Sequence, residues 1–108
     1  MIPLLDTHLH LVYREKASYS WTKDIPPLAE NNFTLDDHKE LTKDLGIGGV
    51  LFMETGVDDQ DYKEETRYVN SLSKKENNII KGIIASIRPE NEEGFDQLIE
   101  EIGLEEFV

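Results

Sequence analysis

Residues 50–53 read Val50-Leu51-Phe52-Met53, a short run of apolar side chains, and Glu54 follows directly. A strand with one solvated face alternates apolar and polar residues, whereas a strand covered on both faces is apolar throughout. Covered strands of this kind are typical of parallel sheets whose connections are helices. The run therefore predicts a buried strand in an α/β fold.

Helical and strand patterns alternate on both sides of this run. Thr34 with Asp37, and Asp61 with Glu64, are N-terminal capping patterns, and Gly46 suits a helix end. The predicted elements are strand 4–12, helix 35–45, strand 50–53, helix 62–72, strand 79–87 and helix 95–102. Residues 105–108 predict the entry to a further strand. This order predicts parallel strands joined by right-handed crossovers.

Three crossover helices on one face of a sheet leave the other face bare, unless the sheet closes into a barrel or another domain covers it. No linker or repeat divides residues 1–108, so we expect a single partial domain of the α/β class. Residues 13–33 show no clean period and contain Pro26-Pro27. An irregular segment of this length inside a small domain is often functional.

Composition and net charge restrict the classes of partner that we expect for this chain. The 108 residues carry 23 acidic and 11 basic side chains, a net charge of −12, which disfavours nucleic acids and anionic membranes as partners. The chain has no cysteine, which excludes disulfides and thiolate metal sites, and no apolar run of the roughly 20 residues that span a bilayer. These features, with no signal-peptide pattern, predict a cytoplasmic protein.

The stretch Leu4–His10 (LLDTHLH) carries the strongest chemical signal. In a regular strand Asp6, His8 and His10 share one face, and the histidines lie at the carboxyl end, where α/β folds collect functional groups. Two imidazoles so placed can bind one Zn²⁺, and Asp6 could orient His8. The alternative is a strand with two incidental histidines.

Four further residues are candidate substrate contacts. Glu54 ends the second strand, Arg88 ends the third and could bind a carboxylate, Trp21 could wall a sugar-sized pocket, and Arg14 lies just past His10. Each has a plainer alternative: a solvated acid for Glu54, surface cations for the arginines, and loop packing for Trp21. His38 is interpreted as a structural or exposed histidine without a partner.

Leu4–His10 resembles the opening strand of the amidohydrolase superfamily, which includes dihydroorotase-like enzymes and TatD-type deoxyribonucleases. Softer patterns resemble the amidohydrolase-related lactone hydrolases, a group that includes sugar lactonases and 2-pyrone-4,6-dicarboxylate lactonase. These patterns are residues 19–21 (YSW), 33–37 (FTLDD), 50–54 (VLFME), 65–68 (ETRY) and 80–84 (IKGII). The resemblance covers essentially the whole chain.

The resemblance implies a (β/α)₈ barrel, of which this chain would hold the first three βα units and the start of the fourth strand. It implies that His8 and His10 bind a divalent metal ion, Zn²⁺ first, or bind the lactone directly as in metal-independent members. The expected function is hydrolysis of a small lactone of a sugar acid or similar carboxylate. The catalytic aspartate is expected beyond Val108, so the fragment alone should have no useful turnover. The alternatives are a TatD-like nuclease and a non-catalytic protein that binds a partner or oligomerises.

Overall fold

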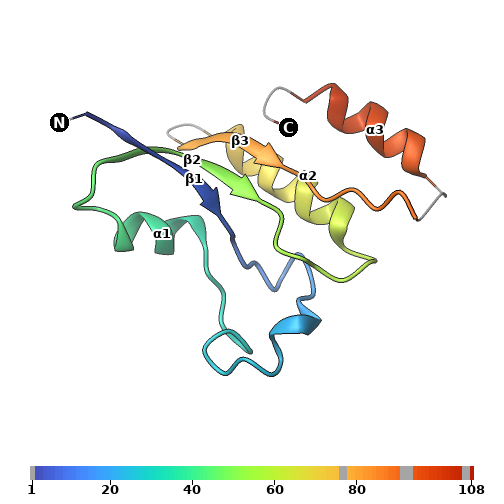
Figure 1. Ribbon diagram of the computed structural model, residues 1–108, viewed down its shortest axis with the longest axis horizontal. Coiled ribbons are helices and arrows are strands. Elements are labelled where there is room, and N and C mark those ends of the chain that lie inside the picture. The colour runs from blue at the N-terminus through green and yellow to red at the C-terminus, as the bar shows by residue number, and fades with distance from the viewer. Residues whose placement is uncertain (1, 76–77, 91–93, 106–107) are drawn as a thin grey trace.

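The fold, taken from a computed structural model, is an open three-stranded parallel sheet with helices between the strands (Figure 1). The structure describes residues 2–75, 78–90, 94–105 and 108. The strands are β1 (Leu4–Leu9), β2 (Ile47–Met53) and β3 (Ile80–Ile84). The helices are α1 (Leu35–Leu41), α2 (Tyr62–Ser73) and α3 (Phe95–Gly103), with one 3₁₀ turn, η1 (Ser20–Thr22). The predicted α/β alternation is confirmed.

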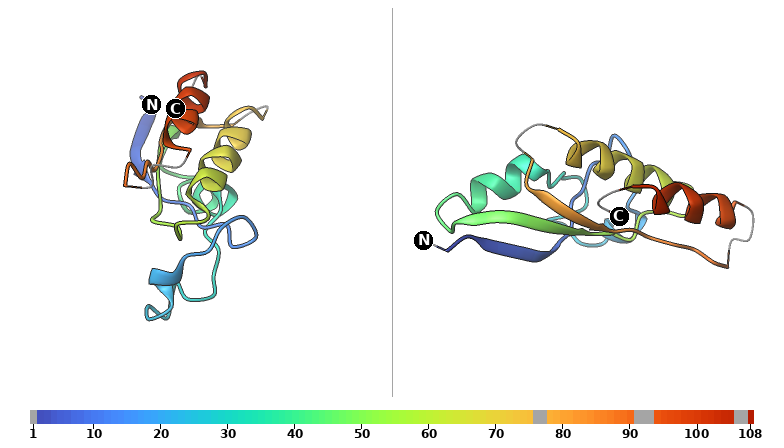
Figure 2. Two further views of the ribbon diagram at one scale, coloured as in Figure 1. Left: turned by 90° about the vertical axis from the view of Figure 1, so that its right-hand side faces the viewer. Right: turned by 90° about the horizontal axis from the view of Figure 1, so that it is seen from above.

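The strand order in the sheet is β1-β2-β3, so each crossover steps in the same direction. Crossovers of one hand that step in one direction place their helices on one face of the sheet. In Figure 2 both crossover helices, α1 and α2, lie on the same side of the strands. Among the described residues, neither crossover helix covers the opposite face, which we call the open face. None of the helices among the described residues is long and apolar enough to span a membrane.

The main core lies between the sheet and the two crossover helices. Val50 and Phe52 of β2 are no more than 1% exposed, and Ile80 and Ile83 of β3 pack beside them. The cluster is completed by Leu9, Leu11, Leu35, Val69 and Leu72. The apolar run that predicted a buried strand is therefore fully buried on one face only, because Leu51 and Met53 point to the open face and are half-buried.

A β-bulge in β1 changes which side chains share a face. Asp6 pairs with Val50 and Leu9 pairs with Phe52, so three residue steps in β1 match two in β2. Asp6 and Leu9 consequently both face the helices, whereas His8 and His10 lie exposed. The prediction that Asp6 shares a face with the histidines is wrong, because it assumed a regular strand.

The segment between β1 and α1 is a closed loop that packs against other parts of the fold. Val12 and Phe33 form an isolated antiparallel bridge, with N–H to O distances of 2.8 and 3.0 Å, that closes the loop at its neck. A second buried cluster joins this loop to the β2–α2 connection and to α3. Its members are Val12, Ala17, Tyr19, Val57, Tyr62 and Leu98.

Helix ends follow the capping chemistry in one case and not in the other. The Thr34–Asp37 capping box is confirmed, with both side chains bonded to the backbone. Asp61 lies at the N-cap of α2, but its carboxylate accepts the Ser18 N–H instead. Helix α1 ends at Leu41 rather than residue 45, and the Thr42 hydroxyl donates to the His38 carbonyl at that end.

Strands β1 and β3 are shorter than predicted, whereas β2 is longer and begins at Ile47 rather than residue 50. β1 ends at Leu9 because Val12 pairs with the returning loop, and β3 ends at Ile84 rather than residue 87. Gly103, expected as the stop of the last helix, is its final residue. The predicted strand entry at 105–108 includes residues 106 and 107, which lie outside the described residues.

Candidate functional site

The two histidines of the sequence motif converge on the open side of the sheet. The Nε2 atoms of His8 and His10 lie 3.0 Å apart, and the ring centroids are separated by 4.8 Å in an edge-to-face arrangement. The bulge in β1 supports this arrangement, because it turns Asp6 toward the helices while both imidazoles stay exposed. The structure therefore brings together the two residues predicted as metal ligands.

The second strand fixes the orientation of His10. Its Nδ1 atom lies 3.2 Å from the Met53 carbonyl oxygen and 3.1 Å from the Glu54 carbonyl oxygen. Carbonyl oxygens only accept hydrogen bonds, so Nδ1 carries the proton and donates it. In the neutral ring, Nε2 then holds a lone pair that points at His8.

Asp6 supports His8 through the backbone rather than through the ring. One carboxylate oxygen, Oδ1, accepts the His8 N–H at 3.1 Å, and the other, Oδ2, lies 3.1 Å from Nε2 of His38. The hydrogen bond from the His8 backbone lowers the pKa of Asp6 and His38 lowers it further, against the opposing effect of burial. The expectation that Asp6 orients the His8 imidazole is not met, and the partner of His38 is Asp6.

The spacing of the histidine pair fits a shared metal ion. Zinc binds imidazole nitrogen at about 2.0–2.1 Å, so two ligand atoms near 3 Å apart can both reach one ion. His10 also has the second hydrogen bond from Nδ1 that metal-ligating histidines usually make. Within the described ranges no group of three or more His, Cys, Asp or Glu residues could hold a metal. The described residues thus offer two ligands and no complete set.

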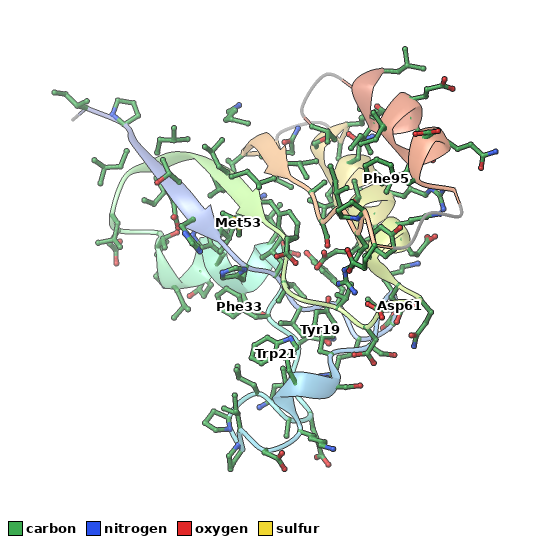
Figure 3. The ribbon with its side chains drawn as sticks, turned by 45° about the vertical axis from the view of Figure 1, so that its right-hand side comes forward. Tyr19, Trp21, Phe33, Met53, Asp61 and Phe95 are labelled. Carbon is green, nitrogen blue, oxygen red and sulfur yellow. The ribbon has the colours of Figure 1, made fainter. Side chains whose placement is uncertain are left out.

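Trp21 lies against the same end of β2 that holds His10. Its Nε1–H donates to the Thr55 carbonyl at 3.0 Å, one residue beyond the carbonyl that accepts from His10. Gly56 lies beside the indole and has φ of +69°, a left-handed backbone conformation that residues with a side chain rarely adopt. The indole remains 48% exposed, and Figure 3 shows it on the loop below the sheet. It is available as an apolar wall.

The carboxylate of Glu54 folds back onto its own loop. Its Oε2 atom accepts the Gly56 N–H at 2.8 Å, and the residue is half-buried. The side chain predicted as a substrate contact therefore helps to shape the turn after β2, next to the histidine pair.

The two arginines predicted as substrate contacts use their N–H groups in hydrogen bonds to other residues of the protein. Arg14 donates to the carbonyls of Leu28 and Asn31 and to the Thr22 hydroxyl, which holds the long loop together. The guanidinium of Arg88 bonds Asp59 and the Val57 carbonyl. Both groups fix loop structure.

Glu65 is a buried acid that the sequence interpretation missed. Its side chain is 4% exposed, and burial raises the pKa of its carboxyl to about 7. Oε2 accepts the Thr55 N–H at 3.2 Å, whereas Oε1 has no partner among the described residues. Its position was a signal, because residue 65 lies within the helical stripe that buries Tyr62, Thr66 and Val69.

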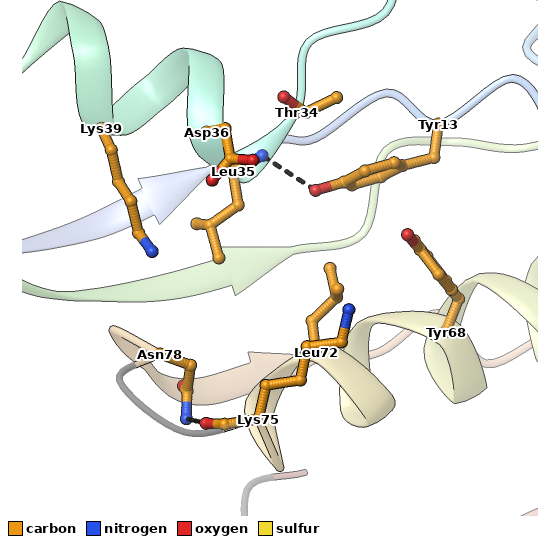
Figure 4. A pocket seen from close by; sticks show the side chains of 9 residues that line it. All are labelled: Tyr13, Thr34, Leu35, Asp36, Lys39, Tyr68, Leu72, Lys75 and Asn78. Carbon is orange, nitrogen blue, oxygen red and sulfur yellow. Dashed lines mark hydrogen bonds between the residues drawn. The ribbon is translucent and has the colours of Figure 1, made fainter.

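A separate hollow of about 360 Å³ lies between α1 and α2, on the helix-covered side of the sheet (Figure 4). Tyr13 and Tyr68 meet edge to face at its rim, with ring centroids 4.9 Å apart, and the Tyr13 hydroxyl accepts the Leu35 N–H at 2.8 Å. Lys39 and Lys75 also line it. It contains neither of the paired histidines.

In comparisons with known proteins, no protein-family model, no curated protein and no solved structure matches the chain. Any functional assignment therefore rests on the geometry described above.

Proposed function

We propose that the chain is part of a metal-assisted hydrolase in which His8 and His10 supply two imidazole ligands to a divalent cation. The leading candidate for this cation is Zn²⁺. One observation carries the proposal. The two Nε2 atoms converge to 3.0 Å while Nδ1 of His10 is tied to the carbonyls of β2. We would not expect an incidental pair of surface histidines to have one ring fixed by hydrogen bonds to the neighbouring strand.

We further propose that the sheet belongs to a (β/α)₈ barrel. Sequential strand order with both crossover helices on one side supports this, because doubly wound sheets reverse direction to cover both faces. Leu5 and Ile84 on the open face are about half exposed, as expected for a surface that further strands cover. The remaining ligands and a catalytic aspartate would then come from strands outside these 108 residues.

The reaction we propose is opening of a small lactone, such as that of a sugar acid. A divalent cation, when bound, polarises a carbonyl and lowers the pKa of water. His8 and His10 would hold that ion, with the His10 ring fixed by β2. The exposed indole of Trp21 offers an apolar surface for the substrate ring. In a version without metal, the same imidazoles would bind the lactone oxygen directly.

Zinc titration of the purified chain, followed by calorimetry, tests the ligand assignment. The wild-type chain is expected to bind Zn²⁺, and the double variant His8→Gln/His10→Gln is expected to lose at least about tenfold in affinity. His38→Gln is the matched control, because it removes the third histidine from the other face. Equal binding by wild type and the double variant would overturn the proposal.

Turnover and assembly provide a second test. With an incomplete ligand set, the 108-residue chain is expected to hydrolyse sugar-acid lactones no faster with Zn²⁺ than without it. Metal-dependent hydrolysis by this chain would contradict the incomplete-site interpretation.

The open face also favours a second candidate function, a non-catalytic protein that oligomerises through it. A discrete oligomer in light scattering, with no histidine-dependent zinc binding, would favour that candidate instead.

A further inference from the structure

We propose that Glu65 is a positioning residue for His10 and acts through the peptide unit between Glu54 and Thr55. The inference rests on the proposed function, in which His10 binds a metal ion. Glu65 lies in α2 and touches neither histidine through any hydrogen bond given by the structure, so its effect is indirect.

The connection runs through a single peptide plane. The carbonyl of Glu54 accepts from Nδ1 of His10 at 3.1 Å, and the N–H of the same peptide, on Thr55, donates to Oε2 of Glu65 at 3.2 Å. In a trans peptide the C=O and N–H groups point in opposite directions. One edge of this peptide therefore faces the histidine pair and the other faces the buried carboxyl.

This arrangement matters because the Nδ1 partner of a metal-binding histidine fixes its tautomer and ring orientation. An acceptor on the N–H side holds the peptide at a fixed rotation and increases the electron density on its carbonyl oxygen, since hydrogen bonds in a chain reinforce one another. Glu65 would thus keep the Glu54 carbonyl aimed at His10 and strengthen it as an acceptor.

Thr55 is held from several directions at once. Its hydroxyl donates to the Leu11 carbonyl at 3.0 Å, and its own carbonyl accepts from Trp21. Glu65 completes this set from inside the fold, where it is 4% exposed and where its other oxygen has no partner among the described residues. Burying a carboxyl costs free energy, so its placement under this turn needs a compensating role.

The test is nuclear magnetic resonance on the metal-free chain, which reads the geometry without any activity. The wild-type chain is expected to show His10 as the Nδ1–H tautomer and a protected Thr55 amide. In Glu65→Leu, we expect mixed His10 tautomers and about tenfold faster Thr55 amide exchange. Glu65→Gln keeps an acceptor oxygen and should restore both signals. Glu64→Leu removes an exposed acid one residue earlier and should change neither.

Zinc titration of the same variants separates this inference from the proposed function. Glu65→Leu should weaken binding about tenfold or more, as removal of outer hydrogen-bond partners does, with Glu65→Gln close to wild type. If zinc binding depends on His8 and His10 but Glu65→Leu leaves the tautomer and the Thr55 amide unchanged, the positioning role is overturned and the proposed function stands. If the tautomer follows Glu65 but zinc does not bind, the positioning of His10 stands and the metal proposal fails.

Discussion

The two faces of the sheet place the same kinds of side chain in opposite surroundings. On the helix-covered face Val50 and Phe52 are buried, and His38 is 4% exposed and bonded to Asp6. On the open face Leu5 is 51% exposed, and His8 and His10 meet in solvent. One face therefore holds the fold together while the other carries the candidate chemistry, and substitutions should separate these two roles.

The largest expected effect is on the helix-covered face. Phe52→Ala should lower the free energy of unfolding by about 3–5 kcal/mol, because it removes a fully buried aromatic side chain from the main core. Leu51→Ala is the matched control from the same strand, and it should cost less than about 1.5 kcal/mol since Leu51 is half-buried on the open face. Urea unfolding measures both. Equal losses would mean that the open face is covered in solution.

The next effect concerns the buried carboxyl of Glu65, whose pKa is raised to about 7 by burial. A raised carboxyl pKa means that the folded chain binds the proton more tightly than the unfolded chain does. Stability should therefore fall as the pH rises from about 4.5 to about 7, and a shift of this size corresponds to about 3 kcal/mol. Glu65→Gln should flatten this decline in thermal unfolding followed across pH. A wild-type profile that is already flat would contradict the assignment.

The smallest expected effect concerns Asp6, whose carboxylate contacts both the His8 backbone and the His38 ring. Asp6→Asn should cost about 1 kcal/mol near neutral pH, because the carboxylate accepts the His8 N–H and pairs with His38. The pKa of Asp6 is lowered, so the stability that its charge contributes is present above the unfolded value and is lost as the pH falls through the folded value. The difference between wild type and variant should therefore shrink in acid. A difference that grows in acid would show that the charge does not stabilise the fold.

Local chemistry made much of the fold predictable. Capping by Thr34 and the apolar run 50–53 located the first crossover helix and the central strand, and alternation of elements gave the parallel sheet. Strand ends were harder, because Val12 pairs with a residue far along the chain and no local pattern records that contact. Which face of β2 would be covered could not be read from four apolar residues.

The sequence predicted the pairing of the two histidines but not the contacts that surround them. His8 and His10 stood out by type and spacing, and they do converge. The bulge that turns Asp6 away is set by the register with β2, which depends on packing rather than on the residues of β1 alone. Glu65 was missed because a helix beginning with acidic residues usually exposes them to solvent.

The bridge between Val12 and Phe33 joins the two ends of the long loop. The chain therefore leaves β1 and returns to α1 at neighbouring points. We expect that the loop tip near Pro26 and Pro27 can change in length or composition without altering the path of either element. A histidine pair held by β1 and β2 can then be combined with different loop tips. In the proposed hydrolase, variation in the loop tip would then be independent of the two histidines.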